Sequence, residues 1–128
     1  MENYPVIKDD VKINNLLDLI RIHFYIKMIE KNVDIKELSN RELSIVCELY
    51  DFGGLLVKDD LKKFTDICVE KDLSENSVQS IRNVLGKARA LGIVKRPKAN
   101  KWIISNDYLP YLESKKLIFK YTVHNLDV

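Results

Sequence analysis

Apolar residues in the first half of the chain recur at helical spacing, and the broadest such pattern covers residues 13–32. Between Ile20 and Met28 the same segment also alternates apolar and polar residues, as a strand does. Its length, its leucines and its lack of Gly or Pro favour a helix. The apolar residues would spread over more than one stripe of that helix, so it needs a cover on two sides. We expect its own domain on one side, and a second subunit is the candidate for the other.

Two shorter helices are expected next. Ser39 and Glu42 have the spacing of a capping box, which predicts a helix from there to about Tyr50. The glycines in 51–54 should end it, because glycine accepts backbone angles that other residues resist. Residues 58–71 place apolar side chains at helical spacing behind two acids that suit a helix N-terminus, and so predict a further helix.

The helix predicted at about 75–91 has two contrasting faces, with Ser74 as its expected N-cap and Gly92 as its expected end. One stripe is apolar and must face the core; it consists of Val78, Ile81, Val84, Leu85 and Ala88. The opposite face lacks the long charges of mixed sign that a solvated helix usually carries; it consists of Gln79, Arg82, Asn83, Gly86 and Ala90. Such a face is typical of a helix pressed against a large partner.

A β-hairpin is expected at about 93–105. Residues 93–94 and 102–105 predict two short strands, and the connection between them contains Pro97 and several cations. Trp102 is predicted to be a core residue of the second strand, since two isoleucines follow it.

The remaining segments complete the expected domain. A short helix is predicted from Asn106 or Asp107 through the stretch YLPYLESKK, and alternation predicts a last strand near 119–124. Residues 1–12 are expected to form an N-terminal arm and residues 13–128 a single domain. The predicted fold class is therefore mainly α with a small β-hairpin.

The charge of this 128-residue chain is unevenly distributed. Its net charge is only +2, but the stretch 76–106 contains seven lysines and arginines and no acid. The rest of the chain therefore sums to −5. A basic surface on a mildly acidic body is the usual electrostatic footprint of a phosphate-binding face.

The sequence gives no sign of catalytic, metal-binding or cofactor-binding chemistry. It has no nucleophile paired with a base and no glycine-rich phosphate loop. Its two cysteines, Cys47 and Cys68, and its two histidines, His23 and His124, do not form a zinc pattern. We expect buried free thiols in a reducing, cytoplasmic compartment, no secretory signal and no membrane association. The prediction is a protein that is not an enzyme and needs no cofactor.

Residues 74–96, SENSVQSIRNVLGKARALGIVKR, resemble the segment from recognition helix to wing in winged-helix transcription regulators. The shared features are serines near the helix start, apolar residues at helical spacing and a Gly-apolar-Val step into the hairpin. Upstream, ELSNRELSIVCELYDFGG is similar to the helix that follows the dimerisation helix of MarR-type regulators. The chain departs from that family in its shorter hairpin, which lacks an Asp-x-Arg signature, and in the absence of paired C-terminal dimer helices.

The resemblance implies a winged helix-turn-helix that binds double-stranded DNA, with helix 75–91 in the major groove and a wing at about 93–105. It also implies a homodimer through helix 13–32. Gln79 and Asn83 would pair with adenine and Arg82 with guanine, while serines and the wing cations would hold phosphates. The implied DNA-binding residues are Ser74, Asn76, Ser77, Gln79, Ser80, Arg82, Asn83, Lys87, Lys95, Arg96, Lys98, Asn100 and Lys101.

Two alternatives remain open at this point. The same architecture serves as a protein-docking module, so the chain could be an adaptor or structural component of a larger assembly, such as a phage virion or a replication complex. A basic face could also meet RNA.

Overall fold

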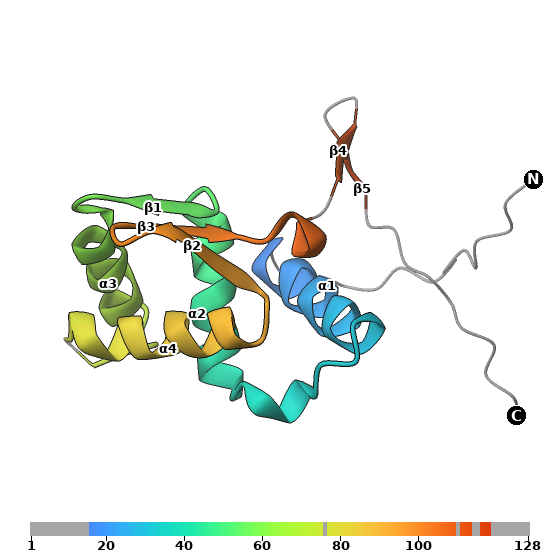
Figure 1. Ribbon diagram of the computed structural model, residues 1–128, viewed down its shortest axis with the longest axis horizontal. Helices are drawn as coiled ribbons and strands as arrows, with labels where there is room; N and C mark the ends of the chain where they lie inside the picture. Colours follow the sequence, from blue (N-terminus) through green and yellow to red (C-terminus); the bar gives the residue numbers. More distant parts are fainter. Residues whose placement is uncertain (1–15, 76, 110, 114–115, 119–128) are drawn as a thin grey trace, which may run out of the picture.

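The computed structural model describes residues 16–75, 77–109, 111–113 and 116–118. Expectations for the arm at 1–12 and for a strand near 119–124 lie outside these residues. The described chain is mainly helical, as predicted, with small antiparallel sheets (Figure 1). Its α-helices are α1 (Leu16–Glu30), α2 (Asn40–Asp51), α3 (Asp60–Glu70) and α4 (Val78–Ala90), and its 3-10 helices are η1 (Ile35–Glu37) and η2 (Asn106–Tyr108). None of the described helices is long and apolar enough to cross a membrane.

The first two α-helices confirm their predictions. Residues Leu16–Glu30 are helical, so the strand alternative for this segment is wrong. At the start of α2, the Ser39 hydroxyl accepts from the Glu42 backbone N–H at 3.1 Å. The Glu42 carboxylate accepts from the Ser39 N–H at 2.9 Å, which completes the capping box. After α2, Gly53 and Gly54 adopt φ of 122° and 74°, in the region where glycine meets little resistance.

Helix α4 begins later than predicted. Its N-cap is Ser77, whose hydroxyl accepts from the Ser80 N–H at 3.3 Å. Ser74 instead donates to the Glu75 carbonyl at 3.0 Å, so its assignment as the N-cap is wrong. Two serines three residues apart offer equivalent caps in sequence, and only the backbone conformation selects between them. At the other end Gly92 has a φ of 81° and follows the last turn, as expected.

The hairpin belongs to a three-stranded antiparallel sheet. The strands are β1 (Leu55–Val57), β2 (Val94–Lys98) and β3 (Lys101–Ile104), in the order β1-β3-β2. Strand β1 was not predicted, since three apolar residues are too short a run to show a period. Strand β2 extends through Pro97, with a register shift between Lys95 and Lys98, and the turn is only Ala99-Asn100. A proline is acceptable there because β2 is an edge strand.

The helix predicted from residue 106 onward is wrong. In the described part of this stretch one 3-10 turn, η2, forms, and two short antiparallel strands follow it, β4 (Tyr111–Glu113) and β5 (Lys116–Ile118). Tyr111 and Ile118, which pair across the two strands, are of residue types that favour strands.

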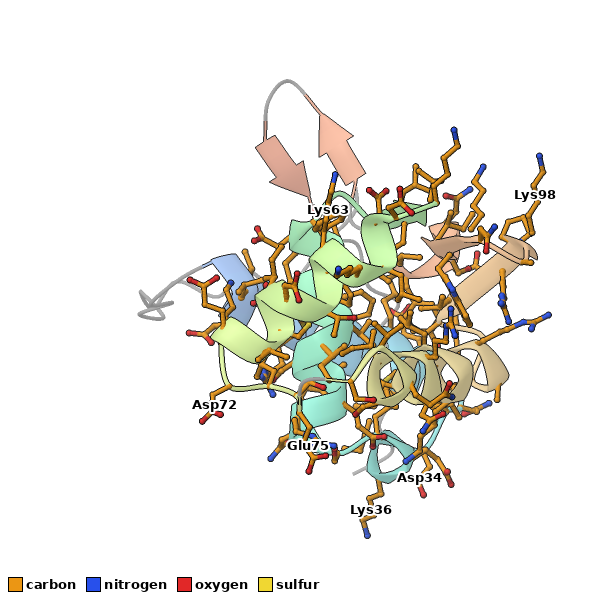
Figure 2. All side chains as sticks on the ribbon, turned by 90° about the vertical axis from the view of Figure 1, so that its left-hand side faces the viewer. Asp34, Lys36, Lys63, Asp72, Glu75 and Lys98 are labelled. Carbon is orange, nitrogen blue, oxygen red and sulfur yellow. The ribbon has the colours of Figure 1, made fainter. Side chains whose placement is uncertain are left out.

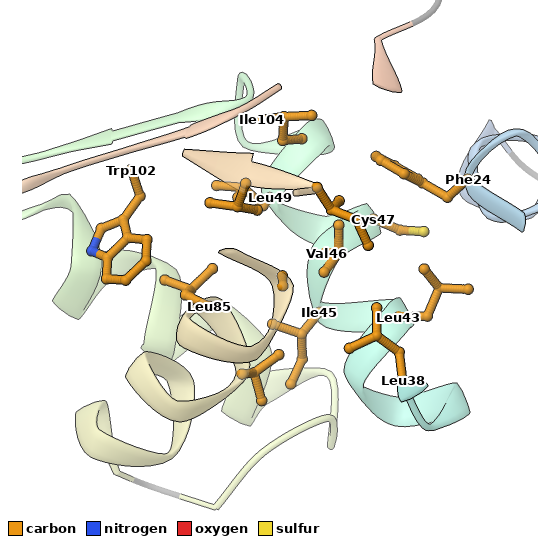
Figure 3. Close-up of a cluster of buried hydrophobic side chains, with 14 of the residues drawn as sticks. Phe24, Leu38, Leu43, Ile45, Val46, Cys47, Leu49, Leu85, Trp102 and Ile104 are labelled. Atoms are coloured by element: carbon orange, nitrogen blue, oxygen red, sulfur yellow. The ribbon is translucent and has the colours of Figure 1, made fainter. Parts of the chain in front are cut away.

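Among the described residues, one apolar core joins all four α-helices and the inner face of the sheet (Figure 3). Trp102 is 4% exposed, which confirms it as a core residue. Cys47 and Cys68 are free and buried, as expected, and burial raises the pKa of each thiol to about 12. Helix α1 covers one end of the core, and the turn of the β2–β3 hairpin lies at the opposite end of the domain, beside α3 (Figure 1).

Candidate nucleic-acid interface

Helix α4 presents the two faces that its sequence predicts. Ile81, Leu85 and Ala88 are fully buried against the core. On the opposite face Gln79 and Asn83 are exposed. The side-chain Nε2 of Gln79 donates to the side-chain Oδ1 of Asn83 at 2.9 Å. This bond orients both amides, and each still has a free donor and a free acceptor for a partner.

Gly86 lies at the centre of the exposed face. A Cβ atom added there would meet nothing within 4 Å, so the packing of this chain does not require a glycine. A glycine inside a helix costs roughly 0.5–1 kcal/mol relative to alanine. The residue therefore lowers the stability of α4 without any compensating contact among the described residues.

The hairpin adds cations beside this helix. Lys95 and Lys98 are exposed, and Lys98 projects away from the hairpin (Figure 2). Arg96 is held differently: its Nε and Nη2 donate to the Ala99 carbonyl at 3.0 and 2.7 Å, and its guanidinium lies 4.6 Å from the centre of the Trp102 ring. These contacts brace the two-residue turn, so Arg96 shapes the hairpin, whereas Lys95 and Lys98 point into solvent.

Lys87 is engaged within the chain. Its ammonium lies 3.0 Å from the Glu42 carboxylate, at the first turn of α2. Burial alone would raise the pKa of Glu42, but hydrogen bonds from the Ser39 backbone and from Lys87 outweigh it and lower that pKa. This ion pair points Lys87 toward α2, which leaves Arg82 as the predicted cation on the outward face of α4.

The serines around the start of α4 mainly serve the local fold. Ser77 caps the helix, and Ser80 supplies the N–H that this cap binds. The hydroxyls of Ser74 and Ser80 lie 3.5 Å apart. Asn76 is outside the described residues. Of the remaining predicted residues, Asn100 is exposed in the turn and Lys101 is half-buried at the start of β3.

The candidate interface contains three further cations, which the sequence analysis does not predict. Arg89 is exposed and follows Arg82 by seven residues, so the helical period alone could have identified it. Lys58 and Lys62 come from the β1–α3 turn and from α3. They line a cleft of about 240 Å³ together with Arg82 and Asn100. Only the tertiary structure brings these segments together.

A second concavity lies at the other end of α4. It measures about 490 Å³ and is lined by Arg89, Gly92, Val94, Lys95, Arg96 and Pro97. Its charged side chains are all cationic, so basic concavities flank both ends of the exposed α4 face.

A scan against protein-family models and searches of curated proteins and of solved structures found no match to this chain. Among the residues that the structure describes, no three His, Cys, Asp or Glu side chains are grouped in a way that could hold a metal ion.

Proposed function

We propose that this protein is a winged-helix DNA-binding protein, with α4 as the recognition helix and the β2–β3 hairpin as the wing. The element order α2-β1-α3-α4-β2-β3, with β1 paired to β3, supports this reading, because it matches the arrangement of winged-helix domains. The acid-free stretch over α4 and the hairpin supplies the charge that binding to phosphates needs.

The strongest support for the proposal is the chemistry of the side chains on the outward face of α4. Gln79 and Asn83 present amide donors and acceptors that match N6 and N7 of adenine, and the Arg82 fork matches O6 and N7 of guanine. Gly86 allows a bulky partner to approach the helix axis closely. Lys95 and Lys98 then follow the phosphate backbone, where contacts position the protein but carry no sequence information.

A homodimer through α1 belongs to the same proposal. The side of α1 opposite the core carries Leu19, Ile22, Ile26 and Ile29, whose alternating spacing of three and four residues forms one seam. Ile22 is 44% exposed and Ile29 is 60% exposed. A second copy would cover these side chains about a two-fold axis and present two α4 helices to a palindromic site, as expected of a transcription regulator.

One observation favours the alternative of a protein-docking adaptor. On the edge strand β1, Leu55 and Val57 are 39% and 37% exposed, and their β3 partners are Ile103 and Lys101. This patch on the outer face of the sheet combines apolar and basic side chains, which would suit an acidic protein segment with apolar residues.

The test is fluorescence anisotropy against a pool of randomised duplexes over a salt series, followed by sequencing of the retained fraction. We expect an enriched motif and a slope of log K against log salt of about −4 to −5, from about four to six phosphate contacts. Absence of binding at low salt would remove the DNA proposal and favour the adaptor.

Two substitutions separate base reading from phosphate binding. Arg82→Ala should relax discrimination at one base pair, at a cost of about 1–3 kcal/mol for the preferred site. Lys98→Ala should weaken binding to all duplexes alike and flatten the salt slope by about one unit. If both variants bind as the parent does, α4 and the hairpin are not the DNA-binding face.

A further inference from the structure

The cleft beside the hairpin turn, here called the turn cleft, gathers cations from three separate elements. Lys58 lies in the β1–α3 turn, Lys62 in α3 and Arg82 in α4. Apolar walls and one neutral polar residue, Asn100, complete it, and the apolar lining consists of Leu56, Leu61, Val78, Ala99 and Trp102. Asp59 is the one acid in the lining, so the cleft keeps a net charge of +2.

The backbone on both sides of the cleft is fixed by hydrogen bonds. The Lys58 N–H donates to the Asn100 carbonyl at 3.2 Å, which ties the β1–α3 turn to the hairpin turn. Lys58 itself adopts a left-handed φ of 49°. The neighbouring Val57 N–H donates to the Asp60 carboxylate at 2.9 Å, and this carboxylate therefore already has a backbone hydrogen-bond partner. The walls of the cleft are therefore formed before any ligand arrives.

The three cations remain available to an anion. Among the residues that the structure describes, none of Lys58, Lys62 and Arg82 lies within 4.0 Å of a carboxylate oxygen. Lys58 and Lys62 are exposed, as is Arg82. Convergent ammonium and guanidinium groups are the usual ligands of a phosphate group.

The volume of the cleft narrows the choice of ligand. At about 240 Å³ it is smaller than the sites of roughly 300–1,000 Å³ that hold typical small-molecule ligands. A phosphate with part of its sugar fits such a space, and the apolar walls suit the sugar. The size favours one backbone unit of a polymer over a free effector molecule.

We propose that the turn cleft binds one phosphodiester group of the DNA strand that passes between the hairpin turn and α3. This inference rests on the proposed DNA-binding function. Lys58 and Lys62 are then positioning residues that bind the phosphate and fix the register of α4 on the duplex. Arg82, on the α4 wall of the cleft, adds to the positive charge there while it reads a base edge together with Gln79 and Asn83.

The test compares two adjacent lysines on α3. Lys62 lines the cleft, whereas Lys63, which is also exposed, does not. Both Lys62→Gln and Lys63→Gln remove one charge from the same helix, so long-range electrostatics changes equally. We expect Lys62→Gln to reduce the salt slope of duplex binding by about 0.9, the value for one phosphate contact, with the enriched motif unchanged. Lys63→Gln should leave the slope at the parent value.

The outcomes separate this inference from the proposed function. If the parent binds duplex DNA and the two variants behave alike, the cleft proposal is wrong while DNA binding stands. If the parent binds no duplex at low salt, the cleft proposal and the proposed DNA-binding function are both wrong.

A second measurement identifies the source of the phosphate. Trp102 is the single tryptophan of the chain and lines the cleft, so its fluorescence reports occupancy. Duplex DNA should change this fluorescence in the parent and in Lys63→Gln, and less in Lys62→Gln. Inorganic phosphate, compared with chloride at equal ionic strength, should change it only weakly. A strong response to inorganic phosphate with none to DNA would assign the cleft to a free phosphorylated ligand and overturn the proposal.

Discussion

Tyr108 holds a buried hydroxyl that has no hydrogen-bond partner among the described residues. The residue is 1% exposed, and its ring stacks on Phe24 with the ring centres 6.1 Å apart. Burial of an unpaired hydroxyl costs roughly 1–3 kcal/mol, whereas the ring contributes apolar packing. The aromatic ring therefore stabilises the contact between α1 and η2, and the oxygen weakens it.

Tyr108→Phe should raise the free energy of unfolding by about 1 kcal/mol, because it keeps the ring and removes the unpaired oxygen. Urea denaturation measures the change. Tyr25→Phe is the matched control: the Tyr25 hydroxyl donates to the Asn40 side chain at 2.9 Å, so its removal should leave stability unchanged or slightly lower. A Tyr108→Phe protein that is less stable than the parent would show that the hydroxyl has a partner.

His23 makes stability depend on pH. It is 1% exposed, and its Nε2 lies 2.7 Å from the Tyr108 carbonyl oxygen. Burial lowers its pKa most strongly; the Tyr108 carbonyl raises it, Lys27 lowers it and Glu30 raises it, and the net result is a pKa below 6.5. The folded chain therefore binds fewer protons at this residue than the unfolded chain. Its contribution to stability is complete above pH 6.5 and is lost as the pH falls from there toward the folded pKa.

The free energy of unfolding should accordingly fall between about pH 7.5 and pH 5.5, a range in which ordinary carboxylates stay ionised. Urea denaturation at a series of pH values measures the slope. His23→Gln, which keeps a side-chain N–H donor, should be nearly flat over the same range. An unchanged slope in His23→Gln would assign the pH dependence to another group.

At the scale of single elements, α4 combines a buried structural face with the face that we propose binds DNA. Its buried stripe follows from the 3.6-residue period and needs no tertiary information. Arg89 falls on the outward face by the same period. The sequence therefore predicts the two faces of α4. It errs at the N-cap, where Ser77 replaces Ser74, and it does not reveal that Lys87 pairs with Glu42.

Substitutions at Gly86 test whether a partner approaches α4 closely. Gly86→Ala should raise the free energy of unfolding by roughly 0.5–1 kcal/mol, since nothing lies within 4 Å of the added Cβ. Gly86→Gln should also fold as well as the parent, but it should bind duplex DNA at least about tenfold more weakly because its longer side chain holds the helix away. Thermal unfolding and anisotropy provide the two readouts. Parent-like DNA binding by Gly86→Gln would rule out a close approach at this position.

At the scale of the whole molecule, α1 and the hairpin turn occupy opposite ends of the domain (Figure 1). A subunit contact through α1 would therefore leave α4 and the hairpin accessible. The exposed isoleucines of α1 are the feature of this end that the core does not explain, since Ile20, Phe24 and Met28 already fill the buried side.

The proposed dimer predicts a concentration-dependent mass. Light scattering at micromolar concentration should give the parent the mass of a dimer. The double variant Ile22→Lys/Ile29→Lys should be a folded monomer. The paired lysines place charges on the seam without touching the buried side of the helix. Leu55→Lys/Val57→Lys, on exposed positions of β1, is the control and should stay dimeric. A monomeric parent would contradict the α1 dimer but not DNA binding by one chain.

The sequence by itself determined the local features of this protein: four helices, the Ser39–Glu42 capping box, the glycine-mediated helix ends and the inward and outward faces of α4. These features depend on neighbours within a few residues, so periodicity and capping chemistry suffice to predict them.

The tertiary structure decided the contacts between distant segments. Pairing of β1 with β3 brings Lys58 to Asn100, and no local pattern encodes that pairing because β1 is only three residues long. Packing likewise joins Lys87 to Glu42 and His23 to Tyr108, across 45 and 85 residues. Each of these contacts depends on the whole core forming at once, so the turn cleft and the titration of His23 could be found only in the folded chain.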